Sequence, residues 1–222
     1  MPKFYPSILL FLVFINFSSY SQKKTLQAKS TVENIIIDGK ENEAAWKTAS
    51  IATDFIMFEP DNGKPISENK KTEVKILYDN TAIYVLATLY DDESNKISKE
   101  LTNRDVAGIS DQFSVSINGY NDGQQDFRFY VSAAGVQMDC LAIEDSEDYS
   151  WDAIWNSEAT LTDFGWVVEM KIPYAALRFA KAEKQTWGLN FMREIKRDFQ
   201  KYTWNHVDTK IGSIITQEGI LE

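Results

Sequence analysis

The amino-acid sequence predicts an all-β protein, a β-sandwich or jelly roll with one or two short helices. Segments that are alternating or wholly apolar recur along its 222 residues, and turn-forming residues separate them. Helical signals are confined to brief stretches, and no internal repeat is visible. No linker rich in proline, glycine or serine divides the chain after residue 31, so one domain is expected over residues 32–222.

The strongest strand signals lie in the middle of the chain. Residues 72–78 and 82–90 flank Asp79-Asn80-Thr81, a pattern that predicts a hairpin. The second of these runs, AIYVLATLY, is apolar on both faces and is expected to be a central strand. Residues 112–117 alternate in polarity, so Phe113 and its apolar neighbours should face the core. The remaining expectations are strands over 127–131, 137–142, 155–161, 166–172, 187–194 and 202–207, a last strand near Ile220, brief helices at 41–46 and 174–179, and an acidic loop at 144–150.

The first residues are typical of a secretory signal. Lys3 precedes an apolar run over residues 8–17, and small residues follow where a signal peptidase would cleave, before Gln22. The alternative is a transmembrane anchor, but a span needs ~20 apolar residues and this run is about half that length. We therefore expect a signal peptide over 1–21, a flexible lead over 22–31, and a bacterial protein that is periplasmic, outer-membrane-associated or extracellular.

The composition favours a binding module over an enzyme based on histidine or cysteine chemistry. The formal net charge of −10 argues against nucleic acid as a partner, because phosphate binding needs clustered lysines and arginines. The single cysteine, Cys140, cannot form an internal disulfide or a thiolate zinc site, and the single histidine, His206, excludes histidine-rich metal sites. The chain contains no G-x-S-x-G, H-E-x-x-H, P-loop or G-x-G-x-x-G motif.

Three groups of motifs together resemble a known family. They are IDGKENEAAW with VKILYDNTAIYVLATLYDD, then RDVAGISDQFSVSIN, then WDAIWNSEATLTDFGWVVEMKIPYAALRF with WGLNFMREIKR. In order and spacing they resemble the family-nine carbohydrate-binding module-like domain, in the version found at the N-terminus of exported Bacteroidetes proteins that continue into an outer-membrane β-barrel region. The resemblance implies a distorted β-sandwich, sugar binding, frequent bound calcium and attachment to larger carbohydrate-active proteins.

The resemblance also implies where the family holds sugar. Sugar-binding members clamp the ligand between two tryptophans, one of them three residues before the Asp that opens the central strand. In this sequence the resemblance places that Asp at Asp111. The clamp position three residues earlier, a tryptophan in those members, is Gly108 here. The second clamp position falls in residues 210–214, which contain no aromatic residue. The polar position within the central strand, usually Glu, is Ser114.

Candidate ligand-binding residues lie near the ends of predicted strands. Trp151 and Trp155 follow the acidic loop and are candidates for an exposed aromatic platform. Trp204, near His206, is a third candidate. Core packing is the alternative for all three, as it is the expectation for Trp46, Trp166 and Trp187.

Charged candidates lie in loops. Arg104 and Asp111 mark one end of the sandwich, where they would bind ligand or pin the loop as a structural ion pair. Asp122 and Asp126 flank Gly123 and are candidates for calcium, without the spacing of a dedicated calcium loop.

The leading functional hypothesis is a non-catalytic module that binds a glycan or envelope polysaccharide. It would belong to a larger envelope protein involved in carbohydrate catabolism. The alternative is a structural or adaptor domain attached to a C-terminal outer-membrane β-barrel, with no sugar ligand. A minor alternative is a glycoside hydrolase-associated domain, although no pair of carboxylates stands out in the sequence. No cofactor other than Ca²⁺ is indicated.

Overall fold

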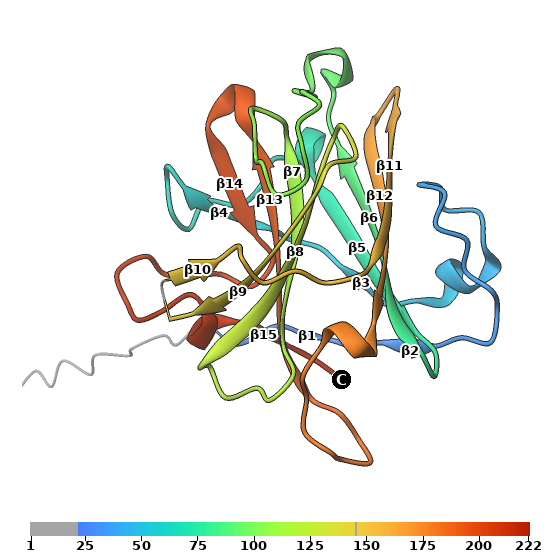
Figure 1. Cartoon of the computed structure of the whole chain (residues 1–222). Helices are drawn as coiled ribbons and strands as arrows, with labels where there is room; N and C mark the ends of the chain where they lie inside the picture. Colours follow the sequence, from blue (N-terminus) through green and yellow to red (C-terminus); the bar gives the residue numbers. More distant parts are fainter. Residues whose placement is uncertain (1–21, 145) are drawn as a thin grey trace, which may run out of the picture.

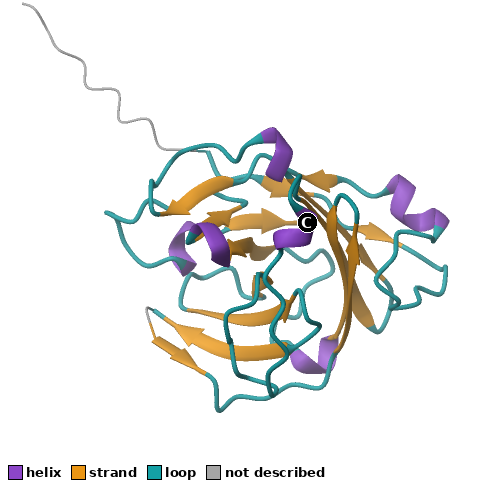
Figure 2. Cartoon of the chain, turned by 90° about the horizontal axis from the view of Figure 1, so that it is seen from above, coloured by secondary structure: helices purple, strands orange, loops and turns teal. Residues whose placement is uncertain are grey.

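The protein is a sandwich of two β-sheets (Figure 1). The structure is a computed structural model that describes residues 22–144 and 146–222, so the predicted signal peptide lies outside it. Within the described residues every helical segment is a short 3₁₀ turn. Figure 2 shows these turns, in purple, in the connections between the strands. In the same part of the chain, no helix has the length and apolarity needed to cross a membrane. The predicted all-β fold class is confirmed.

The larger sheet has nine strands. Its main path runs β1–β15–β13–β7–β8–β9–β10, and β14 pairs with both β13 and β4. All pairings in it are antiparallel except that of β1 with β15. The strands are β1 (Thr25–Leu26), β4 (Ile56–Glu59), β7 (Gln112–Asn118), β8 (Gln125–Ser132), β9 (Gln137–Ile143), β10 (Ser146–Asp148), β13 (Trp187–Ile195), β14 (Gln200–Thr203) and β15 (Gly219–Leu221).

The smaller sheet has six strands. Its order is β11–β12–β6–β5–β2, and β3 pairs with β5. Strand β6, predicted to be central because both of its faces are apolar, lies between β12 and β5 and is buried along all but its last residue. The strands are β2 (Lys29–Ser30), β3 (Ile51–Ala52), β5 (Thr72–Tyr78), β6 (Ala82–Tyr90), β11 (Asn156–Thr162) and β12 (Gly165–Pro173).

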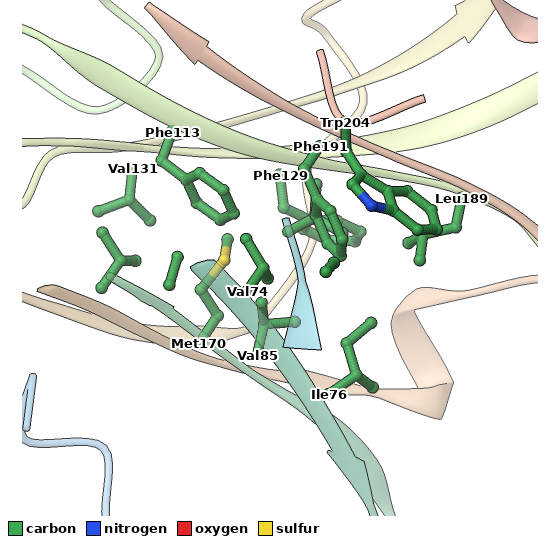
Figure 3. Close-up of a cluster of buried hydrophobic side chains, with 14 of the residues drawn as sticks. Val74, Ile76, Val85, Phe113, Phe129, Val131, Met170, Leu189, Phe191 and Trp204 are labelled. Atoms are coloured by element: carbon green, nitrogen blue, oxygen red, sulfur yellow. The ribbon is translucent and has the colours of Figure 1, made fainter. Parts of the chain in front are cut away.

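The main core fills the space between the two sheets (Figure 3). Phe113 and the other inward residues of β7 are fully buried, as their alternation predicts. From the opposite sheet, Val85 and Met170 point toward the same space. The aromatic rings of Phe113 and Phe191 stack with centroids 6.0 Å apart. The core therefore joins residues far apart in the sequence.

A second, smaller core lies on the outer face of the six-stranded sheet. Trp46 projects from the 3₁₀ turn η1 (Ala44–Thr48) and is fully buried against Tyr84 and Leu86 of β6. The buried carboxylate of Glu169, on β12, accepts the backbone N–H groups of Asp38 and Gly39, each at 2.9 Å. The IDG…W motif is thus structural, because its turn is held by Glu169 and its tryptophan packs on the sheet.

Several local expectations are corrected by the structure. Residues 22–31 are not a free lead, because β1 and β2 pair with β15 and β5. The predicted helices at 41–46 and 174–179 are the 3₁₀ turns η1 and η4 (Tyr174–Ala176). The predicted acidic loop contains β10, paired with β9. The short strands β1, β2 and β10 form because each pairs with the edge of another strand, which the composition of such short segments does not reveal.

Candidate functional site

Two of the predicted site residues, Arg104 and Trp155, meet around one buried carboxylate, that of Asp139 on β9. The guanidinium of Arg104 forms an ion pair with it, and the indole N–H of Trp155 donates to it at 3.1 Å. The backbone N–H of Ala153 donates to its other oxygen at 2.8 Å. Arg104 also pairs with Asp152 at 3.1 Å. This network fastens residues 151–155 to β9, so Arg104 has the structural role that was the alternative for it.

The two tryptophans of the predicted platform have different positions. Trp155 is only 4% exposed and meets Phe129 edge-on, with ring centroids 5.3 Å apart. It is a core residue and not an exposed platform. Trp151 is half-buried, rests on Phe127 at 5.0 Å and lines a cleft of about 450 Å³. We call this the Trp151 cleft; it is lined by Gln125, Phe127, Leu141, Trp151, Asp152, Ala153, Ile154, Ala175, Ala176 and Arg178.

Trp204 and Asp111 are also structural, contrary to their candidacy as ligand residues. Trp204 is 3% exposed and lies beside Phe191, within the main core (Figure 3). Its large apolar ring is buried with the other aromatic residues of the nine-stranded sheet. Asp111 is buried, and its Oδ1 accepts the backbone N–H of Lys196 at 3.0 Å. Burial raises the pKa of Asp111, and no open surface reaches its carboxylate.

The predicted calcium ligands do not form a calcium site. Asp126 is completely buried, and its two oxygens accept Nε and Nη2 of Arg128 at 2.9 and 3.1 Å. Asp122 is exposed and caps the turn by accepting the N–H of Gln124. Nowhere in residues 22–144 and 146–222 do three His, Cys, Asp or Glu side chains gather in a way that could hold a metal ion. The carboxylate of Asp126 is thus already paired with an arginine, and calcium binding here stays a prediction that this arrangement does not support.

The two stretches that the family resemblance assigned to clamping tryptophans are attached at opposite ends of β9. The loop of Gly108 is tied to the first residue of β9, where the N–H of Asp105 donates to the carbonyl of Gln137 at 3.1 Å. In the second stretch, the hydroxyl of Ser213 donates to the carbonyl of Glu144, just past the last residue of β9. Since β9 has seven residues, these ends are separated by roughly 20 Å. Gly108 has no side chain and residues 210–214 contain no aromatic residue, so these stretches offer no aromatic clamp.

A larger cleft of about 600 Å³ gathers four aromatic side chains from three parts of the chain. Tyr78 ends β5, Tyr174 and Phe179 follow β12, and Trp187 begins β13. The rings of Phe179 and Trp187 lie 5.2 Å apart, and Tyr174 meets Phe179 edge-on at 5.8 Å. We call this the aromatic cleft; its other lining residues are Gln27, Ala28, Asp79, Asn80, Ile83, Glu183, Lys184, Gln185, Leu221 and Glu222.

Polar groups surround these rings. The carboxylate of Glu222 accepts Nζ of Lys184 at 3.0 Å and Nε2 of Gln27 at 3.2 Å. Asp79 holds the β5–β6 turn through the N–H groups of Thr81 and Ala82, at 2.6 and 2.9 Å. Burial opposes ionisation of this carboxyl, but its hydrogen bonds together lower the pKa of Asp79 to about 2. The edge of the cleft therefore offers fixed charges, amides and hydroxyls.

Sequence reasoning missed the aromatic cleft because its residues come from separated segments. In Figure 1 the segment that follows β12 and the C-terminus lie at the same end of the molecule, and the N-terminal strands join them there. One sequence signal was available. Tyr78 is polar-tipped and directly precedes the Asp79-Asn80 turn, so an exposed ring was to be expected at that end of β5.

Two facing sheets and an open cleft lined by aromatic and polar side chains define a β-sandwich binding domain. The chain belongs to the carbohydrate family 9 binding domain-like family, whose model matches residues 37–210. The expected family is thereby confirmed. No curated protein matches the chain in sequence.

Solved structures with this fold support the same assignment. A family 9 carbohydrate-binding module from Caldicellulosiruptor kristjanssonii, solved with cellotriose, is 14% identical with a TM-score of 0.62, covering 90% of this chain and 93% of its own. The same organism's module solved with glucose is 15% identical with a TM-score of 0.62, covering 90% and 95%. A Bacteroides uniformis structure described as a putative carbohydrate-binding protein is 10% identical with a TM-score of 0.68, covering 90% and 99%. At these identities the likeness concerns the fold.

Proposed function

We propose that this protein is a non-catalytic glycan-binding module and that the aromatic cleft is its binding site. The observation that supports this most directly is the gathering of four aromatic rings in one cleft edged by amides and carboxylates. We further propose that the module is exported and serves a larger envelope protein in carbohydrate catabolism. The apolar run over residues 8–17 supports export.

The chemistry of the cleft suits a sugar. A pyranose has apolar C–H faces, which pack on aromatic rings, and hydroxyl groups at its edge, which need hydrogen-bond partners. Tyr78 and Phe179 supply apolar surface, while Asn80 and Gln185 supply amide groups. Family 9 modules from Caldicellulosiruptor kristjanssonii have been solved with cellotriose and glucose, which supports the same ligand class for this chain.

Two carboxylates of the cleft support binding without hydrolysis. Glycoside cleavage needs a carboxylic acid whose pKa is raised so that it can protonate the leaving group. Here the pKa of Asp79 is about 2, and the hydrogen bonds and charge of Lys184, with Gln27, lower the pKa of Glu222. Both groups are ionised at neutral pH and already hydrogen-bonded, which suits the positioning of a ligand and not proton donation.

The proposal is tested by glycan titration of residues 22–222 and of two variants. Tyr78 is 37% exposed, so Tyr78→Ala should keep the fold and weaken glycan binding about tenfold, the effect of ~1.4 kcal/mol. Phe179→Ala should weaken it at least as much. Phe199, 85% exposed on the turn between β13 and β14, gives the control Phe199→Ala, with unchanged affinity.

Calorimetry against a panel of neutral oligosaccharides provides the measurement. If both cleft variants bind a sugar as tightly as the parent protein, the aromatic cleft is not the site. If the parent protein binds no member of the panel, glycan binding itself is excluded. Circular dichroism of each variant verifies that the sandwich is intact, so that weaker binding reflects the cleft and not the fold.

A further inference from the structure

We propose that the aromatic cleft and the Trp151 cleft are two parts of one groove, which binds an extended chain of neutral sugars. This inference rests on the proposed glycan binding and adds the length and charge of the ligand. It predicts that a short sugar occupies the aromatic cleft alone, and that a longer chain continues into the Trp151 cleft.

The two clefts share one wall, the segment 174–179. Tyr174 and Phe179 line the aromatic cleft, whereas Ala175, Ala176 and Arg178 line the Trp151 cleft. The side chains of this short segment therefore divide between the two sides. Ala175 and Arg178 are exposed, so the crest of the wall is open to a ligand that passes over it.

The wall is held rigidly between the two clefts. The N–H of Tyr174 donates to the carbonyl of Thr81 at 3.0 Å, and its hydroxyl donates to the carbonyl of Asp79 at 2.9 Å. At the other end Phe179 forms a β-bridge with Gly119. The two backbones approach so closely there that a Cβ added to Gly119 would lie 2.2 Å from the carbonyl oxygen of Arg178. Because both ends are fixed, the two clefts keep a constant spacing, as a repeating polymer requires.

The Trp151 cleft repeats the chemistry of its neighbour. The half-buried indole of Trp151 is supported from beneath by Phe127 and provides an aromatic surface. The guanidinium of Arg178 is positioned by the carbonyls of Ala175 and Leu177, at 3.3 and 2.9 Å, and Gln125 adds an amide. An aromatic plate with hydrogen-bonding groups at its edge is again the arrangement that suits a pyranose.

The charge of the combined groove selects the kind of sugar. Four acidic residues line the two clefts, against two basic residues, Lys184 and Arg178. Lys184 is paired with Glu222 and Asp152 with Arg104, which leaves Asp79 and Glu183 against Arg178. A polymer of uronic acids would meet net negative charge, while neutral sugars would meet hydrogen-bond acceptors at no electrostatic cost. The ligand class is therefore a neutral polysaccharide chain.

Chain length provides the test. Residues 22–222 are titrated calorimetrically with matched di- and hexasaccharides of β-1,4-glucan, β-1,4-xylan and α-1,4-glucan, and with a polyuronate hexamer. For the linkage that binds, the hexasaccharide should bind at least about tenfold more tightly than the disaccharide, because the second cleft is engaged within one molecule. The polyuronate should bind at least about tenfold more weakly than the neutral hexasaccharide.

Variants assign the length effect to the second cleft. Trp151→Ala should abolish the advantage of the hexasaccharide and leave disaccharide affinity unchanged. Arg178→Ala, at an exposed position, should reduce the same advantage without affecting the fold. Tyr78→Ala should weaken both ligands, and Phe199→Ala should change neither.

The outcomes separate this inference from the proposed function. Equal affinity for the two lengths, or a length advantage that survives both Trp151→Ala and Arg178→Ala, would overturn the single groove while leaving glycan binding in place. Binding of the polyuronate as tightly as the neutral chain would overturn the ligand class. If no neutral sugar of either length binds, the proposed function fails and this inference fails with it.

Discussion

At the scale of single residues, buried acids explain most of the motifs that the sequence offers. Glu169 is the clearest case. Burial raises its pKa to about 7, although the N–H groups of Asp38 and Gly39 act in the opposite direction. The neighbouring Glu43 adds to the increase. A carboxyl with this pKa in the folded state and about 4.5 when unfolded couples the stability of the sandwich to pH.

The sign of this coupling can be predicted. Because the folded state retains the proton that the unfolded state releases, the contribution of Glu169 is fully present below pH 4.5 and is lost as the pH rises to about 7. The loss amounts to at most about 3 kcal/mol. Urea unfolding from pH 4.5 to 8 should show this decline for the parent protein, and Glu169→Gln should remove it.

Glu158 provides the control for this experiment. It lies directly opposite Glu169 on β11 but is exposed, so Glu158→Gln should keep the decline of the parent protein. If Glu169→Gln and the parent lose stability equally across this pH range, another group is responsible. The unfolding free energy must be compared at each pH, because other buried acids such as Glu218 also have a raised pKa.

At the scale of elements, the N-terminal segment connects the two sheets. Strand β1 extends the nine-stranded sheet beside β15, and β2 then pairs with β5 of the six-stranded sheet. Between them, the N–H of Ala28 donates to the carbonyl of Glu222 at 2.7 Å. The same segment forms one side of the aromatic cleft, through Gln27 and Ala28. The position of the candidate site therefore depends on a segment whose composition suggested a flexible lead.

This role predicts the effect of a single substitution in β1. Leu26 is buried in the main core, so Leu26→Ala should lower the unfolding free energy by about 2–4 kcal/mol through lost burial and the cavity that remains. Val32, fully exposed just beyond β2, gives the control Val32→Ala, with a change below about 0.5 kcal/mol. Denaturant unfolding measures both. Equal, small effects would mean that β1 adds nothing to the folded sandwich.

Elements differ in how far their sequence determines them. Strand β6 was predictable, because nine apolar or small residues between turns have only one favourable environment, the centre of a sheet. Strands β1 and β10 were not, since β1 has only two residues, β10 has three polar ones, and both are strands because they pair with β15 and β9. The final strand, β15, was expected near Ile220 and is found there.

At the scale of the whole molecule, the candidate site is a product of topology. Its rings lie at the ends of β5, β12 and β13, which belong to two different sheets. The alternation of polar and apolar residues along a strand predicts which face of the sheet each side chain takes. It does not reveal which strand ends lie next to each other in the folded protein. The residues chosen from the sequence, Trp155, Trp204 and Asp111, proved to be buried for this reason. Aromatic residues in a β-sandwich are mostly core, and exposure depends on loops that local patterns do not define.

The opposite end of the sandwich is closed by Arg193, which projects from β13 into the space between the sheets. Its Nη1 donates to the carbonyl of Lys70 at 2.6 Å and to the hydroxyl of Thr72 at 3.1 Å, and its Nη2 donates to the carbonyl of Tyr90 at 2.8 Å. Burial lowers its pKa to about 10, so it remains charged at neutral pH. The ends of β5 and β6 are thereby tied to the nine-stranded sheet.

Removing the hydrogen bonds of Arg193 should destabilise the two sheets together. Arg193→Ala leaves a buried carbonyl and hydroxyl without donors and should lower the unfolding free energy by about 3–5 kcal/mol. Arg193→Lys should not restore it, because a single ammonium cannot reproduce a planar fork that reaches several acceptors. Hydrogen exchange distinguishes a tie from a local contact. We expect protection to fall by similar amounts at β5 and at β13, whereas loss at β13 alone would show that the sheets are held together by their apolar core without Arg193.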